Sequence, residues 1–149
     1  MTDKSLTKAY IQTKKRNSLS VNLNISLADI KELKNYQYLL VIHSSSSKCV
    51  KAMVYPIKKE KIIKISLWGP KTSNKIIEDL SEVFQNYDII HTSGLLIKKK
   101  QFFYECYLNL SLSDMKSKHL KASLDKIKNR FNKISIEEIG LKKSEKVKI

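Results

Sequence analysis

The sequence contains little glycine, proline or cysteine, and each scarcity narrows what the chain can be. Its 149 residues include three Gly and two Pro, and 42% of them are hydrophobic. Disordered segments lack so much apolar content, so we expect a folded chain. Cys49 and Cys106 show no Cys-x-x-Cys spacing, so neither a zinc site nor a redox motif is indicated. We predict that both are small core residues with reduced thiols.

Long apolar runs are also absent. No stretch approaches the roughly 18 apolar residues that cross a bilayer. The N-terminal "MTDKSLTKAY" contains no apolar signal segment. We therefore expect a cytoplasmic protein without a membrane partner.

Catalytic motifs are missing as well. His43, His91 and His119 fall in different expected elements, and no local Ser/His/Asp, Cys/His or metal-ligand spacing occurs. The adjacent Glu137 and Glu138 would point to opposite faces of a strand. The sequence thus predicts a protein that is not an enzyme and that holds no cofactor or metal.

Basic residues, by contrast, are abundant. Lys and Arg number 29 against 14 Asp and Glu, which gives a net charge of +15. A polyanion is the expected partner, because cations gain affinity by releasing condensed counterions from phosphates. Only Arg16 and Arg130 are arginine, so few side chains suit bidentate reading of guanine. A genome of biased nucleotide composition can also enrich a protein in Lys and Ile. The positive charge therefore has a second possible origin, which the sequence leaves open.

Residues 1–58 predict a small module with the order β-β-α-β-β. A strand is expected over 8–14, and a second over 19–25, where apolar and polar residues alternate. The "KKRN" between them predicts a turn, since Asn17 tolerates a left-handed backbone. Ser26 and Asp29 fit a capping pattern for a short helix over 26–35. Two further strands, joined at "SSSS", are expected in "YQYLLVIHSSSSKCVKAMVYPI".

Residues 59–142 predict the order β-α-β-β-α-β. The strands are "KIIKISLW", "DIIHTSGLLI", "QFFYECYLNL" and "SIEEIGL", with one helix in "NKIIEDLSEVFQNY" and one that Ser113 or Asp114 caps. This ferredoxin-like order places two helices on one face of a four-stranded antiparallel sheet. The predicted fold class is therefore α+β, with residues 143–149 as a solvated basic tail.

The stretch "GPKTSNKIIEDLSEVFQNYDII" resembles the opening of an ACT domain. The resemblance implies a module that dimerises or senses an amino acid or another small anionic ligand where the first loop meets the helix. Free N–H groups at a helix N-terminus suit a carboxylate or phosphate. The same stretch also fits an ordinary strand-to-helix turn. The predicted ligand-binding residues are Gly69, Pro70, Lys71, Thr72, Ser73, Asn74 and His91.

The first half, with its cationic first turn, resembles the swapped-hairpin domains of AbrB-type regulators. There, two chains interlace into a dimer, and basic residues around the first hairpin contact DNA. The resemblance implies a homodimeric transcriptional regulator that binds double-stranded DNA. Cations and small polar groups suit phosphates, and Arg16 and Asn22 suit base edges. The predicted DNA-binding residues are Lys8, Lys14, Lys15, Arg16, Asn17, Ser18, Ser20 and Asn22.

Two other functions remain open from the sequence. The chain is also compatible with a small-molecule sensor or protein-interaction module without DNA binding. An RNA-binding protein is the second alternative, with Phe103 and Tyr107 stacking bases on the sheet face opposite Cys106.

Overall fold

The structure is a computed structural model that describes residues 7–70 and 74–141. The predicted basic tail, residues 143–149, lies outside the described residues. The chain divides into two units, one up to Leu33 and one from Lys34 onward. The boundary expected at residue 58 falls inside the second unit.

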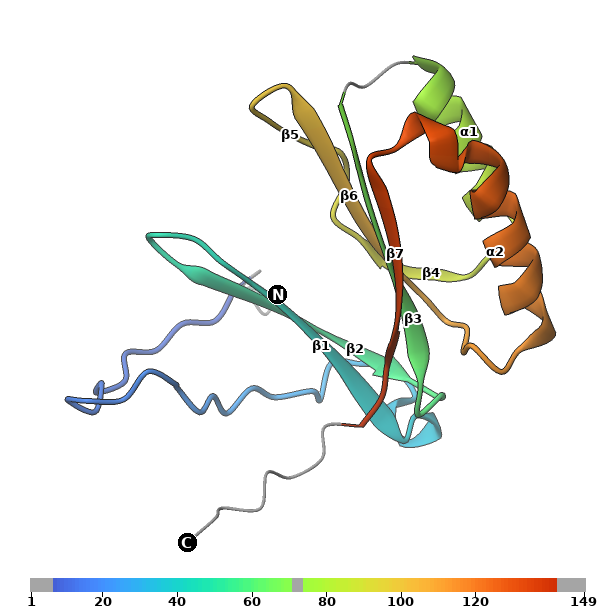
Figure 1. Ribbon diagram of the computed structural model, residues 1–149. Helices are drawn as coiled ribbons and strands as arrows, with labels where there is room; N and C mark the ends of the chain where they lie inside the picture. The colour runs from blue at the N-terminus through green and yellow to red at the C-terminus, as the bar shows by residue number, and fades with distance from the viewer. Residues whose placement is uncertain (1–6, 71–73, 142–149) are drawn as a thin grey trace, which may run out of the picture. The chain divides into compact units, whose positions relative to one another are not determined.

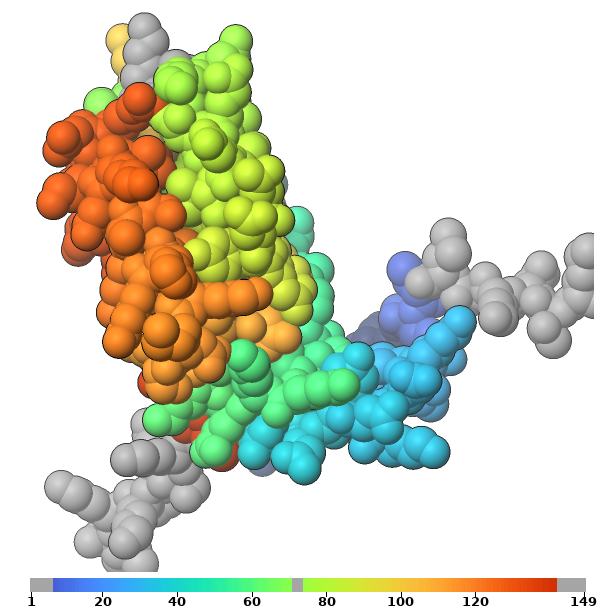
Figure 2. All heavy atoms as spheres, turned by 90° about the vertical axis from the view of Figure 1, so that its right-hand side faces the viewer, coloured from blue at the N-terminus to red at the C-terminus, as the bar shows by residue number. Residues whose placement is uncertain are grey.

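The second unit is built on an antiparallel sheet of five strands with two helices. The strands are β3 (Ile62–Gly69), β4 (Ile89–Thr92), β5 (Leu96–Lys98), β6 (Gln101–Leu108) and β7 (Lys133–Ile139). Their order is β4-β6-β3-β7, and β5 pairs with β6. Helices α1 (Asn74–Phe84) and α2 (Met115–Ile127) lie side by side on one face, and the short helix η2 (Lys128–Arg130) follows α2 (Figures 1 and 2). The predicted α+β class is confirmed.

The order of elements over residues 62–139 is β-α-β-β-α-β, with β5 as an added short strand. The stretch expected as one strand, "DIIHTSGLLI", is divided into β4 and β5. Gly94, with a φ of 71°, adopts the left-handed conformation between them. Both short strands pair with β6, so the stretch still forms that edge of the sheet.

The main core lies between the sheet and the helices. Ile63, Ile65 and Leu67 of β3 are at most 1% exposed, and their alternation points them toward the helices. The other strands and the helices contribute Ile76, Leu80, Phe84, Phe102, Cys106, Leu108, Leu120 and Leu124. Cys106 is buried as predicted, and burial raises the pKa of its thiol to about 12. It therefore stays protonated at neutral pH.

A two-stranded hairpin covers part of the opposite sheet face. Strands β1 (Tyr38–Ser45) and β2 (Val50–Ile57) pair in antiparallel register, as expected. Leu40 of β1 packs with Ile62 and Tyr107, which lie on the face away from the helices. The prediction that Cys49 is a core residue is wrong. It is exposed because it belongs to the β1–β2 turn, where its carbonyl accepts a hydrogen bond from the Ser46 N–H at 2.9 Å.

The first unit differs most from the prediction. The expected strands over 8–14 and 19–25 and the helix over 26–35 do not form in residues 7–35 of the structure; only the 3-10 helix η1 (Leu33–Asn35) does. A strand requires a hydrogen-bonded neighbour, and the alternating side chains of residues 19–25 remain exposed. Glu32 has a φ of 55°, which an α-helix cannot contain. The "KKRN" turn itself is confirmed, because the Ser18 N–H donates to the Lys15 carbonyl at 3.2 Å.

An ion pair fastens α1 to the end of α2. Asp79 of α1 is 7% exposed, and its carboxylate contacts the Arg130 guanidinium of η2. Lys75, one turn earlier in α1, lies 3.4 Å from the same carboxylate. Of the two arginines in the sequence, Arg130 thus has a structural role in this ion pair, whereas Arg16 is exposed in the first unit.

A substitution of Gly69, at the end of β3, would test how tightly this core is packed. A Cβ at this position would lie 2.5 Å from Cε1 of Phe102, whose ring is buried against Phe131. We predict that Gly69→Ala lowers the free energy of unfolding by about 1 to 3 kcal/mol through overpacking. Urea denaturation measures the change. Gly140→Ala is the control, because its Cβ would meet only Lys61 Cγ at 3.7 Å, and equal stability of the two variants would contradict the prediction.

Candidate functional site

The predicted DNA-binding residues lie on the first unit, along two chain arms joined by a turn. All are exposed except Ser18, which is half-buried. All of them except Arg16 and Asn17 line one hollow of about 1070 Å³. Arg16 and Asn17 form the tip of the turn. The structure thus brings together the cations and small polar groups that the sequence nominated.

The arms around this hollow are joined by side-chain contacts and not by a strand ladder. The Gln12 side-chain amide donates to the Asn22 carbonyl at 3.2 Å, and the Ser18 hydroxyl donates to the Ser20 carbonyl at 2.8 Å. Lys8 Nζ lies 4.0 Å from the Asp29 carboxylate, which offsets part of its charge. The trio Lys14, Lys15 and Arg16 therefore supplies the most concentrated positive charge of this segment.

The predicted ligand loop stands between β3 and α1. Gly69 ends β3, Pro70 follows it, and Asn74 begins α1. Lys71, Thr72 and Ser73 lie outside the described residues. The close approach of the Phe102 ring gives Gly69 a packing role that requires no ligand.

His91 is not brought to this loop. It pairs in register with Tyr107, as does Lys64, whereas Gly69 pairs with Phe102. Five residues along β3 thus separate the two places, or about 16 Å at the usual strand rise. His91 Nδ1 lies 2.8 Å from the Tyr55 hydroxyl, and its ring packs against Tyr107, so it joins the hairpin to the sheet.

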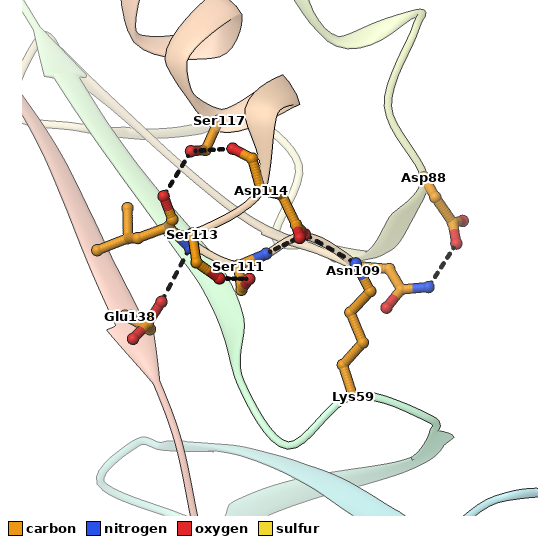
Figure 3. A network of polar contacts seen from close by, with 9 residues as sticks. Lys59, Asp88, Asn109, Ser111, Ser113, Asp114, Ser117 and Glu138 are labelled. Atoms are coloured by element: carbon orange, nitrogen blue, oxygen red, sulfur yellow. Dashed lines mark hydrogen bonds and ion pairs between the residues drawn. The ribbon is translucent and has the colours of Figure 1, made fainter.

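A polar network fixes the start of α2 (Figure 3). The Asp114 carboxylate accepts hydrogen bonds from Lys59 Nζ at 2.8 Å and from the Ser111 N–H at 2.9 Å. Asp114 occupies the N-cap position, but its side chain does not cap the helix. The hydrogen bonds from Lys59 and Ser111 lower the pKa of Asp114 below its ordinary value of 3.8. The Glu138 carboxylate accepts from the Leu112 N–H at 2.9 Å and ties the same loop to β7.

The sheet face opposite the helices carries residues that the sequence reasoning missed. Phe103 is half-buried on this face, as expected for the RNA-binding alternative, whereas the hairpin buries Tyr107. Trp68 lies beside Phe103, with ring centroids 6.5 Å apart. Lys133 Nζ stands 5.0 Å from the Trp68 ring centroid. The alternation of side chains along β3 could have placed Trp68 on this face. The sequence does not give the cross-strand register that pairs Trp68 with Phe103 and with Lys133.

Neither a metal centre nor a membrane span occurs in the part of the chain that the structure describes. No group of three or more His, Cys, Asp or Glu residues there has the arrangement to hold a metal ion. None of the helices among those residues has the length and apolar character needed to span a membrane.

Comparisons with known proteins assign no family. No family model and no curated protein matches the chain. A solved structure that is similar to it is a formyltetrahydrofolate deformylase from Pseudomonas putida KT2440, with a TM-score of 0.37 and 10% sequence identity. The match covers 54% of this chain and 28% of that one.

The Asp114 network generates a pH prediction. The pKa of the Asp114 carboxyl group is lowered in the folded state. The stability that the ionised carboxylate contributes is therefore complete above the ordinary carboxyl pKa, and it is lost as the pH falls through the folded pKa. We predict that Lys59→Gln lowers stability at pH 7 and reduces the further loss of stability between pH 7 and pH 3. Urea denaturation at both pH values measures this. Lys61→Gln is the control, because Lys61 Nζ lies 3.8 Å from the Glu138 carboxylate, a longer contact than the 2.8 Å between Lys59 and Asp114, and its loss should change stability less. An unchanged pH dependence in Lys59→Gln would contradict the prediction.

Proposed function

We propose that this protein is a transcriptional regulator that binds duplex DNA through the segment of residues 8–22. The carrying observation is the hollow whose lining combines Lys8, Lys14 and Lys15 with the small polar groups of Ser18, Ser20 and Asn22. Lysines are long point charges that suit phosphates, and hydroxyl and amide groups hydrogen-bond to the DNA backbone. Arg16 at the turn is the candidate for reading a base edge.

The net charge of +15 supports a polyanionic partner. Each phosphate that a cation neutralises releases counterions, so affinity arises without sequence-specific contacts. The exposure of residues 8–17 leaves these cations accessible to a long duplex, which does not need to enter an enclosed cavity. This accessibility favours DNA over a small ligand for the segment.

The first unit becomes more ordered when it pairs with a second copy of the chain. Leu19, Val21, Leu23 and Ile25 alternate like strand residues, yet they are between 54% and 105% exposed. An alternating apolar face without a covering partner forms a strand when a neighbour supplies hydrogen bonds. A second copy of the chain supplies that neighbour in the AbrB-type arrangement that the sequence resembles.

The second unit has the dimerising or ligand-sensing role in this proposal. Its β-α-β-β-α-β order is that of ferredoxin-like domains, the ACT type included. A dimer presents two basic segments to one duplex, and the second contact then binds at a high effective concentration. A small anionic ligand at the Gly69–Asn74 loop remains the proposed effector.

DNA affinity should depend strongly on salt. If a dimer neutralises about six phosphates, log K falls against log salt with a slope near −5, since each contact contributes about −0.9. We predict that the combined change of Lys14, Lys15 and Arg16 to Ala makes this slope shallower by several units and weakens binding. Fluorescence anisotropy with a labelled duplex at several salt concentrations measures both quantities.

A matched control separates the segment from total charge. Lys116, Lys118 and Lys121 are exposed on α2, and their combined change to Ala removes the same number of charges from another surface. This control should retain most of the affinity. If both triple variants lose affinity equally, charge alone governs binding and the proposed interface is wrong.

A further inference from the structure

The part of the sheet face beyond the contacts of the β1–β2 hairpin holds a second candidate site, made of other residues than the basic segment. We define the aromatic patch as Trp68 of β3, Phe103 of β6, Leu96 and Lys98 of β5, and Lys133 of β7. Trp68 and Phe103 are directly paired across β3 and β6, and Leu96 pairs with Phe103. Lys133 pairs with Trp68 across β3 and β7. Four neighbouring strands thus present these side chains on one face.

A hollow lies within this patch. It has a volume of about 350 Å³, and Trp68, Phe103, Leu96, Lys98 and Glu105 are among its lining residues. This volume is near the lower end of the roughly 300 to 1,000 Å³ that small-molecule sites occupy. Trp68 and Phe103 are half-buried, so their rings rest on the sheet while part of each remains accessible. A flat, apolar group of modest size fits this arrangement.

The charges around the hollow favour an anionic ligand that carries such a group. Lys98 borders the hollow, and Lys133 lies over the Trp68 ring at 5.0 Å. Glu105 would repel an anion, but Lys64 Nζ lies 3.4 Å from its carboxylate and offsets its charge. Burial acts to lower the pKa of Lys64, yet Tyr107 and Glu105 outweigh it and raise that pKa, so Lys64 stays cationic.

The turn between β5 and β6 extends the positive rim. Lys99 and Lys100 have φ values of 49° and 64°, in the left-handed region where hairpin turns prefer Asn and Gly. Together with Lys98 they form a run of three exposed cations next to the hollow. Phosphates that follow a bound base would meet this run.

We propose that the aromatic patch binds unpaired bases of single-stranded nucleic acid. One base stacks against Phe103 and Trp68, and the adjoining phosphates contact Lys98 and Lys133. Every base has a flat π-face, so such stacking tolerates different sequences. The bases of a duplex are stacked on one another and cannot enter the hollow, so the patch discriminates against the ligand of the basic segment.

Trp68 is the only tryptophan of the chain and reports binding at this site directly. The experiment titrates the full chain with a 12-nucleotide oligouridylate, the matching oligothymidylate and a duplex of equal length, and follows Trp68 emission. Both single strands should quench the emission, whereas the duplex should change it little. A stronger response to oligouridylate identifies RNA as the natural source, and a stronger response to oligothymidylate identifies DNA.

Variants test the assigned contacts. Phe103→Leu keeps an apolar side chain but removes the aromatic face, and should weaken single-strand binding about 5- to 100-fold. Lys133→Ala should reduce the salt slope by about 1. Lys98 is exposed at the end of β5, so Lys98→Ala leaves the core unchanged. This variant tests the phosphate contact and, like Lys133→Ala, should reduce the salt slope by about 1, also if Phe103→Leu fails to fold.

The chain offers a matched pair of controls. Tyr36 and Lys58 form another cation–aromatic contact, at 5.8 Å, outside the patch. Tyr36→Leu and Lys58→Ala should bind the single strands like the unaltered protein. If they lose as much affinity as the patch variants, or if single strands bind without changing Trp68 emission, the proposal is overturned.

Two further outcomes distinguish the aromatic patch from the basic segment and from a dimer interface. The combined Lys14, Lys15 and Arg16 variant should lose duplex affinity and retain quenching by single strands, so the two proposals fail or succeed independently. Loss of the quenching in that variant would overturn a separate site on the sheet. Trp68 emission that depends on protein concentration alone would show that a second copy covers the patch, which also overturns it.

Discussion

The alternation of side chains along β3 is the constraint on which most of this structure depends. Ile63, Ile65 and Leu67 face the helices, so Ile62, Lys64, Ser66 and Trp68 must face the other way. Fully burying each large aliphatic side chain contributes about 1.5 to 3 kcal/mol. A shift of register by one residue would expose the first set and bury Lys64, so the register is strongly specified. The register of β3 that builds the core therefore also determines which side chains lie on the opposite face and remain for binding.

The two sheet faces consequently have different chemistry. One is apolar along its length and is closed by α1 and α2. The other is divided, because the hairpin packs through Leu40 on Ile62 and Tyr107, while Trp68 and Phe103 lie farther along the same strands. His91 belongs to the closed part of this face, where it contacts Tyr55 and Tyr107. This position explains why His91 and the Gly69 loop, both nominated as ligand residues, are far apart.

The sequence predicted elements where local pattern and tertiary packing agree. The helical spacing of Ile76, Leu80 and Phe84 and the alternation of β3 and β6 both match buried faces in the structure. Residues 19–25 show an equally clear alternation but form no strand, because alternation identifies an apolar face and cannot identify the neighbour that would cover it. The helix expected over 26–35 does not form, and Glu32 has a left-handed backbone that its residue type does not reveal. The aromatic patch was missed for a related reason, since only strand register brings Trp68, Phe103 and Lys133 together.

Nucleic-acid binding is the central claim, and two-dimensional NMR of the 15N-labelled protein tests it most directly. At 17.3 kDa the chain gives resolved backbone spectra, and the indole N–H of its single tryptophan provides a separate signal. With duplex DNA, the largest shift changes should fall on residues 8–22. With a single strand, they should fall on the Trp68 indole and the neighbouring positions of β6. Spectra that both nucleic acids leave unchanged, or changes spread evenly over exposed lysines of α2, would contradict the claim.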